Sequence, residues 1–207
     1  MRPQFEEGGK FHAFRSVYDG FETFLYTPRT VAAMDGVQVH DAIDSKRTMI
    51  IVVLALLPCF LFGCYNCGYQ HWLAAGETTF PFFRLFFYGL LSILPMVIVT
   101  YVVGLGIEFI VAQWRREEIQ EGFLVTGLIL PMICPIDTPL WMVALATAFA
   151  VIFAKEVFGG TGYNIVNIAL TARAFLFFAY PSKMSGDKAF IATDPIGTWA
   201  PAVPDGF

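Results

Sequence analysis

The sequence predicts an all-α integral membrane protein with about five transmembrane or discontinuous helices. Of its 207 residues, 57% are hydrophobic and only 14% are Asp, Glu, Lys or Arg, whereas a soluble domain carries roughly 25% charged residues. The mean hydropathy is +0.62. Two stretches, 48–76 and 85–107, contain no such charged residue, and each can supply the roughly 20 apolar residues that cross a bilayer core. Neither is a secretory signal peptide, because the polar segment 1–47 precedes both.

Residues 1–47 form a polar arm that we expect to lie in the cytoplasm. Within the arm, apolar residues recur at three- and four-residue spacing, which predicts an amphipathic helix over 10–26. The recurring residues are Phe11, Phe14, Val17, Tyr18, Phe21 and Leu25. This helix would lie on the membrane surface or dock on a partner, and Thr27-Pro28 ends it.

The membrane domain, 48–181, is predicted to contain two long helices at about 48–68 and about 84–113. Three shorter apolar pieces follow, at 122–136, 138–154 and 164–181. Prolines and glycines separate these short pieces, which therefore resemble discontinuous or steeply tilted helices. Such broken backbone is tolerated at membrane depth only where it is buried in protein or lines a cavity.

Basic residues predict the orientation of the chain in the membrane. Basic pairs at 46–47 and 115–116 flank the two long helices, and Lys155 follows the piece 138–154, whereas the loop 67–80 has no Lys or Arg. The positive-inside rule therefore places the N-terminus in the cytoplasm and this loop outside. Five crossings would leave the segment 182–207 as a loop on the outer side.

The cysteines and the charge distribution exclude two classes of function. Cys64-x-x-Cys67 has the spacing of half a redox or zinc site, but no second Cys/His pair follows at metal spacing. We therefore interpret these thiols, with Cys59 and Cys134, as buried or lipid-facing. No basic stripe indicates a nucleic acid partner.

Glu108 is the most costly polar residue in the apolar part of the chain. A carboxylate within a span costs about 3 kcal/mol on insertion scales. Two interpretations are open: the side chain reaches the cytoplasmic interface and pairs with Arg115, or it faces the bundle interior and holds a cation or proton. Gly104 and Gly106 allow a helix or a ligand to approach the backbone nearby. Asp137, between two prolines, is expected to cap a helix.

A second polar region reads FGGTGYNIVNIALTARAFLFFAYP and spans 158–181. Its glycines are Gly159, Gly160 and Gly162. They can be a plain helix break, with Asn164 capping the next helix. Alternatively, Asn164 and Asn167 share a helix face that Arg173 roughly continues. Amides both donate and accept, which suits the edge of a flat heteroaromatic ring, so this second interpretation is a cofactor pocket. Neither GxGxxG nor GxxxxGK[ST] occurs.

The stretch 154–181, AKEVFGGTGYNIVNIALTARAFLFFAYP, resembles the signature of the B subunit of the sodium-translocating NADH:quinone oxidoreductases. Further matches are FEEGGK at 5–10, LYTP at 25–28, DSKR at 44–47 and EGF at 121–123. The D subunit of the related Rnf complex is similar in the membrane core but lacks the N-terminal arm with the FExGGK pattern. The arm therefore favours the sodium-translocating family, and the resemblance covers essentially the whole chain.

The resemblance implies a subunit of a six-subunit respiratory complex in the bacterial inner membrane, an NADH:quinone reductase that exports Na+. Electrons pass in that complex from NADH through flavins and iron–sulfur centres to quinone. The implied partners are the other subunits, quinone, Na+ and the lipid bilayer. The implied fold is one half of a urea-channel-like fold of ten helices. The implied cofactors are riboflavin and an FMN joined through its phosphate to a threonine of an [ST]-G-A-T motif.

The resemblance also implies three groups of site residues. The riboflavin pocket would contain Gly159, Gly160, Gly162, Asn164 and Asn167, to which the helix-face argument adds Arg173. The quinone region would contain Gly104, Leu105 and Gly106, with Leu105 in place of a family glycine. Sodium would bind at Glu108 and at Asp19 in the arm. No catalytic residue and no other metal are expected, because the electron chemistry belongs to the flavins.

Two departures from the family pattern matter. Ile168 stands where the family has proline, which predicts a changed helix start. No [ST]-G-A-T motif occurs, since the Ser-Gly at 185–186 is followed by Asp187. The family's flavin-bearing threonine lies beyond residue 207, so we expect this sequence to be an N-terminal half.

Three alternatives are open. The first is an RnfD-type subunit of an ion-translocating ferredoxin:NAD oxidoreductase, and the second is a transporter or channel without redox chemistry. The third is a scaffold half that lacks the cofactor site. Bound flavin would separate the redox subunit from the plain transporter.

Overall fold

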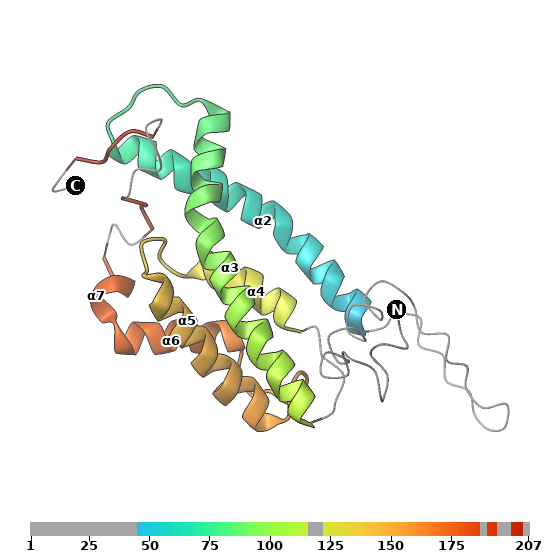
Figure 1. Cartoon of the computed structure of the whole chain (residues 1–207). Helices are drawn as coiled ribbons and strands as arrows, with labels where there is room; N and C mark the ends of the chain where they lie inside the picture. The colour runs from blue at the N-terminus through green and yellow to red at the C-terminus, as the bar shows by residue number, and fades with distance from the viewer. Residues whose placement is uncertain (1–44, 116–121, 187–189, 194–199, 205–207) are drawn as a thin grey trace, which may run out of the picture.

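The computed structural model describes residues 45–115, 122–186, 190–193 and 200–204. Within these ranges the chain is helical and has no strand, which confirms the predicted fold class. The elements are α2 (Ser45–Ala74), α3 (Phe82–Arg115), α4 (Phe123–Ile133), α5 (Leu140–Ala150), η3 (Val151–Lys155), η4 (Glu156–Phe158), α6 (Ile168–Ala179) and α7 (Pro181–Met184) (Figure 1). The expected arm helix at 10–26 and the candidate Asp19 lie outside the described residues.

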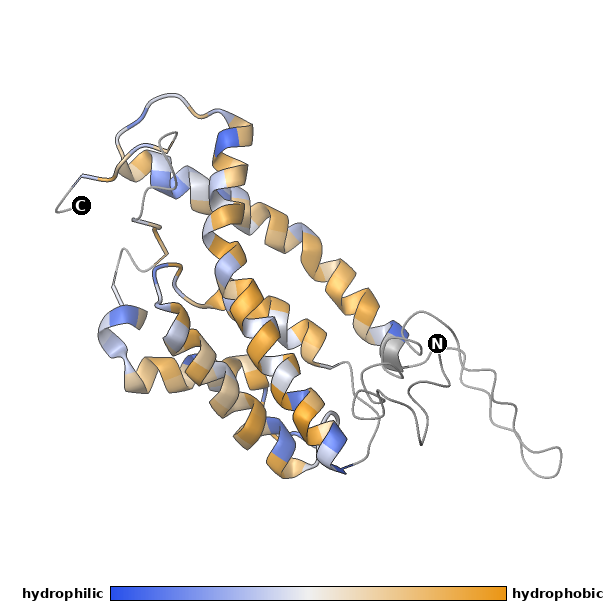
Figure 2. Cartoon of the chain, in the orientation of Figure 1, coloured by the Kyte–Doolittle hydropathy of each residue, from blue (hydrophilic) through white to orange (hydrophobic). Residues whose placement is uncertain are grey.

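Among the described residues, three helical segments are long and apolar enough to cross a membrane: 47–74, 82–115 and 140–158. The last of these is α5 continued by η3 and η4. By contrast, α4 and α6 have 11 and 12 residues, and at about 1.5 Å per residue each covers little more than half of a core of about 30 Å. Figure 2 shows that hydrophobic residues make up most of the length of these helices. The two long helices and the short α4 and α6 agree with the prediction. The piece expected to be short at 138–154 is instead a third span-length segment, 140–158, because η3 and η4 continue α5, so that expectation is wrong.

The helices α2 and α3 approach each other closely near the connection 75–81, which we call the loop end. A Cβ added at Gly68 of α2 would overlap the carbonyl oxygen of Leu85, and one added at Gly89 of α3 would overlap that of Cys64. Each helix thus supplies a glycine where the other presents its backbone. Small residues at such crossings let membrane helices pack closely.

Helix α3 is the centre of the fold, because it contacts α2, α4 and α5 (Figure 1). On the side of α4, α5 and α6 it borders a core that includes Phe123, Val143, Val151 and Leu176, all fully buried. The share of buried residues in the most apolar part of each span rises along the chain. It is 6% in 47–74, 22% in 82–115 and 39% in 140–158.

At the loop end, His71 of α2 holds the segments 190–193 and 200–204. The ring is fully buried; its Nδ1 lies 2.7 Å from the carbonyl oxygen of Ala192, and its Nε2 lies 2.9 Å from that of Pro201. The ring also stacks on Tyr88 at a centroid distance of 4.0 Å, and the Tyr88 hydroxyl lies 2.9 Å from Nδ1. A polar residue near the end of an apolar helix thus joins two distant segments.

Asp137 does not cap a helix, so that expectation is wrong. The N-cap of α5 is Pro139, which makes no side-chain capping bond. The Asp137 carboxylate instead accepts hydrogen bonds from the Thr193 amide at 3.1 Å and the Thr193 hydroxyl at 2.7 Å. Asp137 therefore fixes the same segment that His71 holds.

Candidate functional site: a buried ion pair beside a glycine turn

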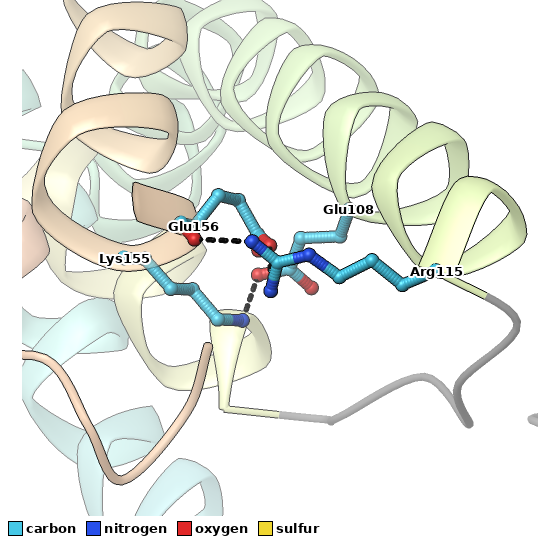
Figure 3. A network of polar contacts seen from close by, with 4 residues as sticks. All are labelled: Glu108, Arg115, Lys155 and Glu156. Carbon is cyan, nitrogen blue, oxygen red and sulfur yellow. Dashed lines mark hydrogen bonds and ion pairs between the residues drawn. The ribbon is translucent and has the colours of Figure 1, made fainter. Parts of the chain in front are cut away.

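Glu108 and Lys155 form a buried ion pair between two of the candidate spans. Glu108 lies in α3 with 4% of its surface exposed, and Lys155 ends η3 with 2% exposed. The Lys155 Nζ donates to Oε1 of Glu108 (Figure 3). Removing either partner of such a pair leaves an uncompensated buried charge.

A π-helical turn places Lys155 at the carboxylate. Residues four apart on α5 and η3 face the core: Val143, Thr147, Val151 and then Lys155 are all buried. An α-helix has 3.6 residues per turn, so a four-residue spacing drifts around its axis. The wider turn of η3, Val151–Lys155, reduces this drift and keeps Lys155 in line with Val143, Thr147 and Val151. We call this line of four residues the buried stripe. π-turns within helices are frequent at functional sites.

The second carboxylate oxygen of Glu108 has no hydrogen-bond partner among the described residues, although it is buried. A buried polar atom without a partner costs free energy, and such atoms are few in native proteins. Oε2 of Glu108 therefore needs an explanation beyond the ion pair. One explanation is a ligand that a carboxylate oxygen attracts, such as a cation.

Arg115 does not pair with Glu108, so the first interpretation of Glu108, an ion pair with Arg115, is wrong. Its Nη1 lies 3.8 Å from Oε2 of Glu156, and its Nη2 donates to the Glu156 carbonyl oxygen at 2.6 Å (Figure 3). This contact ties the end of α3 to η4. We call Glu108, Lys155, Arg115 and Glu156 the charged cluster; its two acids and two bases cancel.

The glycine turn ends the 140–158 segment directly after the charged cluster. Gly159, Gly160 and Gly162 have φ of 113°, 97° and 95°, in the left-handed region that glycine adopts most easily. The amide of Gly160 donates to the Lys155 carbonyl oxygen at 3.1 Å, and that of Gly159 donates to the Glu156 carbonyl oxygen at 3.2 Å. These bonds satisfy carbonyl groups at a helix end.

The two asparagines both precede α6, so they do not share a face of that helix. Asn167 is the N-cap, since its side-chain oxygen accepts from the Leu170 amide at 3.1 Å. The expectation that Asn164 caps the helix is therefore wrong. Asn164 accepts from the Gly162 amide and donates to the Val166 carbonyl oxygen, each at 3.2 Å, which orders the loop between the glycines and the helix.

Ile168 stands where the resemblance implies proline, and a helix starts here without it. It is the first residue of α6, directly after the Asn167 cap. Proline is favoured at this position because it has the right φ and needs no N–H partner there. The cap and the burial of Ile168, which is 8% exposed, keep the start without proline. Arg173 lies farther along α6 and is half-buried.

The three residues of the expected quinone region have different surroundings. A Cβ at Gly104 would overlap the ring of Phe123, so this glycine makes room for the first residue of α4. Leu105 packs against the core. The space around a Cβ added at Gly106 is open for 4 Å. Gly104 therefore has a packing role, and Gly106 is the open position of the three.

Comparison with known proteins identifies the family. Residues 33–206 match the family model described as NQR2, RnfD, RnfE family. This chain belongs to the NQR2, RnfD, RnfE family. The match includes every helix described above, so the helices and the charged cluster are those of an NQR2, RnfD, RnfE family member.

Three curated relatives are each named as the B subunit of a Na(+)-translocating NADH-quinone reductase. The protein of Stutzerimonas stutzeri is 41% identical over 212 residues, which cover 92% of this chain and 52% of the relative. That of Pseudoalteromonas atlantica is 39% identical over 224 residues, covering 96% and 55%. That of Azotobacter vinelandii is 40% identical over 212 residues, covering 92% and 52%. The chain thus spans about half the length of these relatives, and the resemblance stated from the sequence is confirmed.

The residue of the charged cluster whose partner the sequence analysis missed is Lys155. In the sequence analysis, Lys155 serves only as a basic residue after the piece 138–154 that supports the predicted orientation. A further signal was present, because Lys155 continues the four-residue spacing of Val143, Thr147 and Val151. That pattern indicates a lysine on a buried face, which requires an acidic partner.

Proposed function

We propose that this chain is part of the membrane subunit of a sodium-translocating NADH:quinone oxidoreductase and that Glu108 binds the transported Na+. The names of the relatives support this reading over an RnfD-type subunit. The other subunits, quinone and Na+ would be its partners in a bacterial inner membrane. The N-terminus would lie in the cytoplasm, as the basic residues favour.

The observation that carries the sodium proposal is the buried carboxylate of Glu108. It lies within a candidate span, it is 4% exposed, and its Oε2 lacks a partner among the described residues. Ionisable groups in such positions are expensive and mark ion pathways. Coupling to electron transfer requires that the site bind Na+ differently in the two redox states of a cofactor.

Glu108→Gln is expected to raise the Na+ concentration for half-maximal quinone reduction at least about tenfold, equal to about 1.4 kcal/mol of lost binding. Gln keeps the size of the side chain and removes its charge. The measurement is the sodium dependence of NADH:quinone reduction by the intact complex, with flavin content as a check on assembly.

The matched control is Glu156→Gln. Glu156 belongs to the same charged cluster but pairs with Arg115 instead of Lys155. Loss of the Glu156 charge is therefore expected to leave the sodium dependence of quinone reduction unchanged. An unchanged sodium dependence in Glu108→Gln would remove Glu108 from the sodium path.

A flavin pocket at the glycine turn is the second part of the proposal. Asn164 and Asn167 use their side-chain oxygens within the chain. The side-chain N–H groups of Asn167 make no hydrogen bond to the described residues, so they could donate to a ring carbonyl group. Riboflavin held there would supply the redox chemistry; these residues would orient it. The covalent FMN would be carried by a threonine outside these residues.

Asn167→Asp separates capping from flavin binding. Aspartate keeps the acceptor that caps α6 but has no N–H donor, whereas Asn167→Ala loses the cap at about 1 kcal/mol. We expect Asn167→Asp to keep the thermal stability and lose riboflavin, measured as acid-extractable flavin per complex. Full riboflavin content in the Asp variant would leave Asn167 with the capping role alone.

A further inference from the structure

Lys155 occupies the place of a cation at Glu108. Its ammonium group is buried with the carboxylate and bonded to Oε1, while Oε2 lacks a partner among the described residues. The pair as it stands is neutral. The carboxylate charge that would attract Na+ is therefore already compensated from within the chain.

We propose that Lys155 is a built-in competitor of Na+ at Glu108: Na+ binds when the ammonium group withdraws, and the ammonium group returns when Na+ leaves. This inference rests on the proposed function of Glu108. It makes Lys155 a residue that sets the sodium affinity of the site.

Charge balance supports exchange over joint binding. If Na+ joined Glu108 while Lys155 stayed, two positive charges would share one carboxylate in a buried place. Buried like charges repel strongly, and an unbalanced buried charge is costly. Nearby, Arg115 and Glu156 already balance each other, so they offer no spare negative charge for a second cation.

The local backbone provides a way to withdraw the ammonium group. Lys155 is the last residue of the π-helical η3, and the glycine turn begins four positions later, after the three residues of η4. Conversion of η3 to a regular α-turn would restore the ordinary angular drift and rotate Lys155 off the buried stripe. Glycines at positive φ, including Gly159 and Gly160, end the segment close by and can absorb this rotation.

The first test measures sodium affinity in the intact complex. Lys155→Met keeps the apolar stem of the side chain and removes its charge. The Na+ concentration for half-maximal quinone reduction is expected to fall about tenfold, because the competitor is gone. If Glu108→Gln raises this concentration while Lys155→Met leaves it unchanged or raises it, Glu108 is a sodium site and Lys155 is not a competitor. If neither variant changes it, the proposed function of Glu108 fails as well.

The second test measures thermal stability. Membranes are heated and then extracted with detergent, and the readout is the temperature at which the subunit is lost from the soluble complex. Lys155→Met leaves Glu108 uncompensated, so this temperature should fall in choline chloride and recover in NaCl at equal ionic strength. The neutral double variant, Glu108→Gln with Lys155→Met, should respond equally to both salts. A Lys155→Met subunit that is lost in both salts while the double variant survives would overturn the inference, because Na+ then cannot replace the ammonium group.

Discussion

Gly89→Ala is expected to force α2 and α3 apart and to destabilise the chain by about 3 kcal/mol, the upper part of the usual range for overpacking. The added methyl would overlap the backbone carbonyl of Cys64. A backbone atom cannot move aside by changing rotamer, so a helix has to shift. That shift would also disturb the reciprocal contact of Gly68 with Leu85. The measurement is unfolding in mixed micelles against the mole fraction of denaturing detergent.

Gly63→Ala is the control for Gly89→Ala. Gly63 also lies within a long apolar helix, α2, but unlike at Gly89, a Cβ added at Gly63 meets nothing within 4 Å. Alanine has the higher helix propensity, by about 1 kcal/mol, so this variant should be neutral or slightly stabilised. Equal unfolding curves for the two variants would mean that the crossing does not depend on the glycine.

His71→Phe is expected to release the segment 200–204 from the loop end and to loosen 190–193, which Asp137 still holds through Thr193, at a cost of about 3 kcal/mol. Phenylalanine keeps the ring that stacks on Tyr88 but has no nitrogen for the carbonyl oxygens of Ala192 and Pro201. Those two oxygens would lose buried partners. Limited proteolysis in detergent, with cleavage sites read by mass spectrometry, should show faster cutting between 185 and 204.

Tyr88→Phe provides the graded comparison. It removes the hydroxyl that lies 2.9 Å from His71 Nδ1 and leaves both carbonyl contacts of His71 intact. Its effect on cleavage should be smaller, on the order of 1 kcal/mol. A larger effect for Tyr88→Phe than for His71→Phe would place the anchor of these segments on Tyr88.

Apolar runs located the helical pieces of the described part of the chain, because a charge-free stretch of sufficient length has few alternatives to a membrane helix, but they made the 140–158 segment too short. They did not give the start of α6, predicted at 164 and observed at Ile168. Asn164 and Asn167 are equally good caps by residue type. The choice between them depends on the geometry of the glycine turn, which no local preference encodes.

The candidate site was predictable for one of its two central residues. Glu108 stood out because a carboxylate is rare and costly in a charge-free run. Its partner was not predictable in the same way, since Lys155 is 47 positions away and reaches Glu108 through the packing of α3 against the 140–158 segment. Arg115 was the nearer base in sequence, but the extended end of α3 directs it to Glu156. The four-residue spacing that ends at Lys155 indicates a buried face, but it does not identify Glu108 as the partner.

The rise in burial from 6% to 39% along the three spans has a consequence for biosynthesis. Only 6% of the most apolar part of the span 47–74 is buried, so this part can enter the bilayer before its neighbours are made. The 82–115 span follows and brings Glu108 with it. The 140–158 span comes last and carries Lys155, a residue that lipid alone would reject. Insertion of that lysine is then assisted by a carboxylate already in the membrane, so the order of synthesis favours formation of the ion pair.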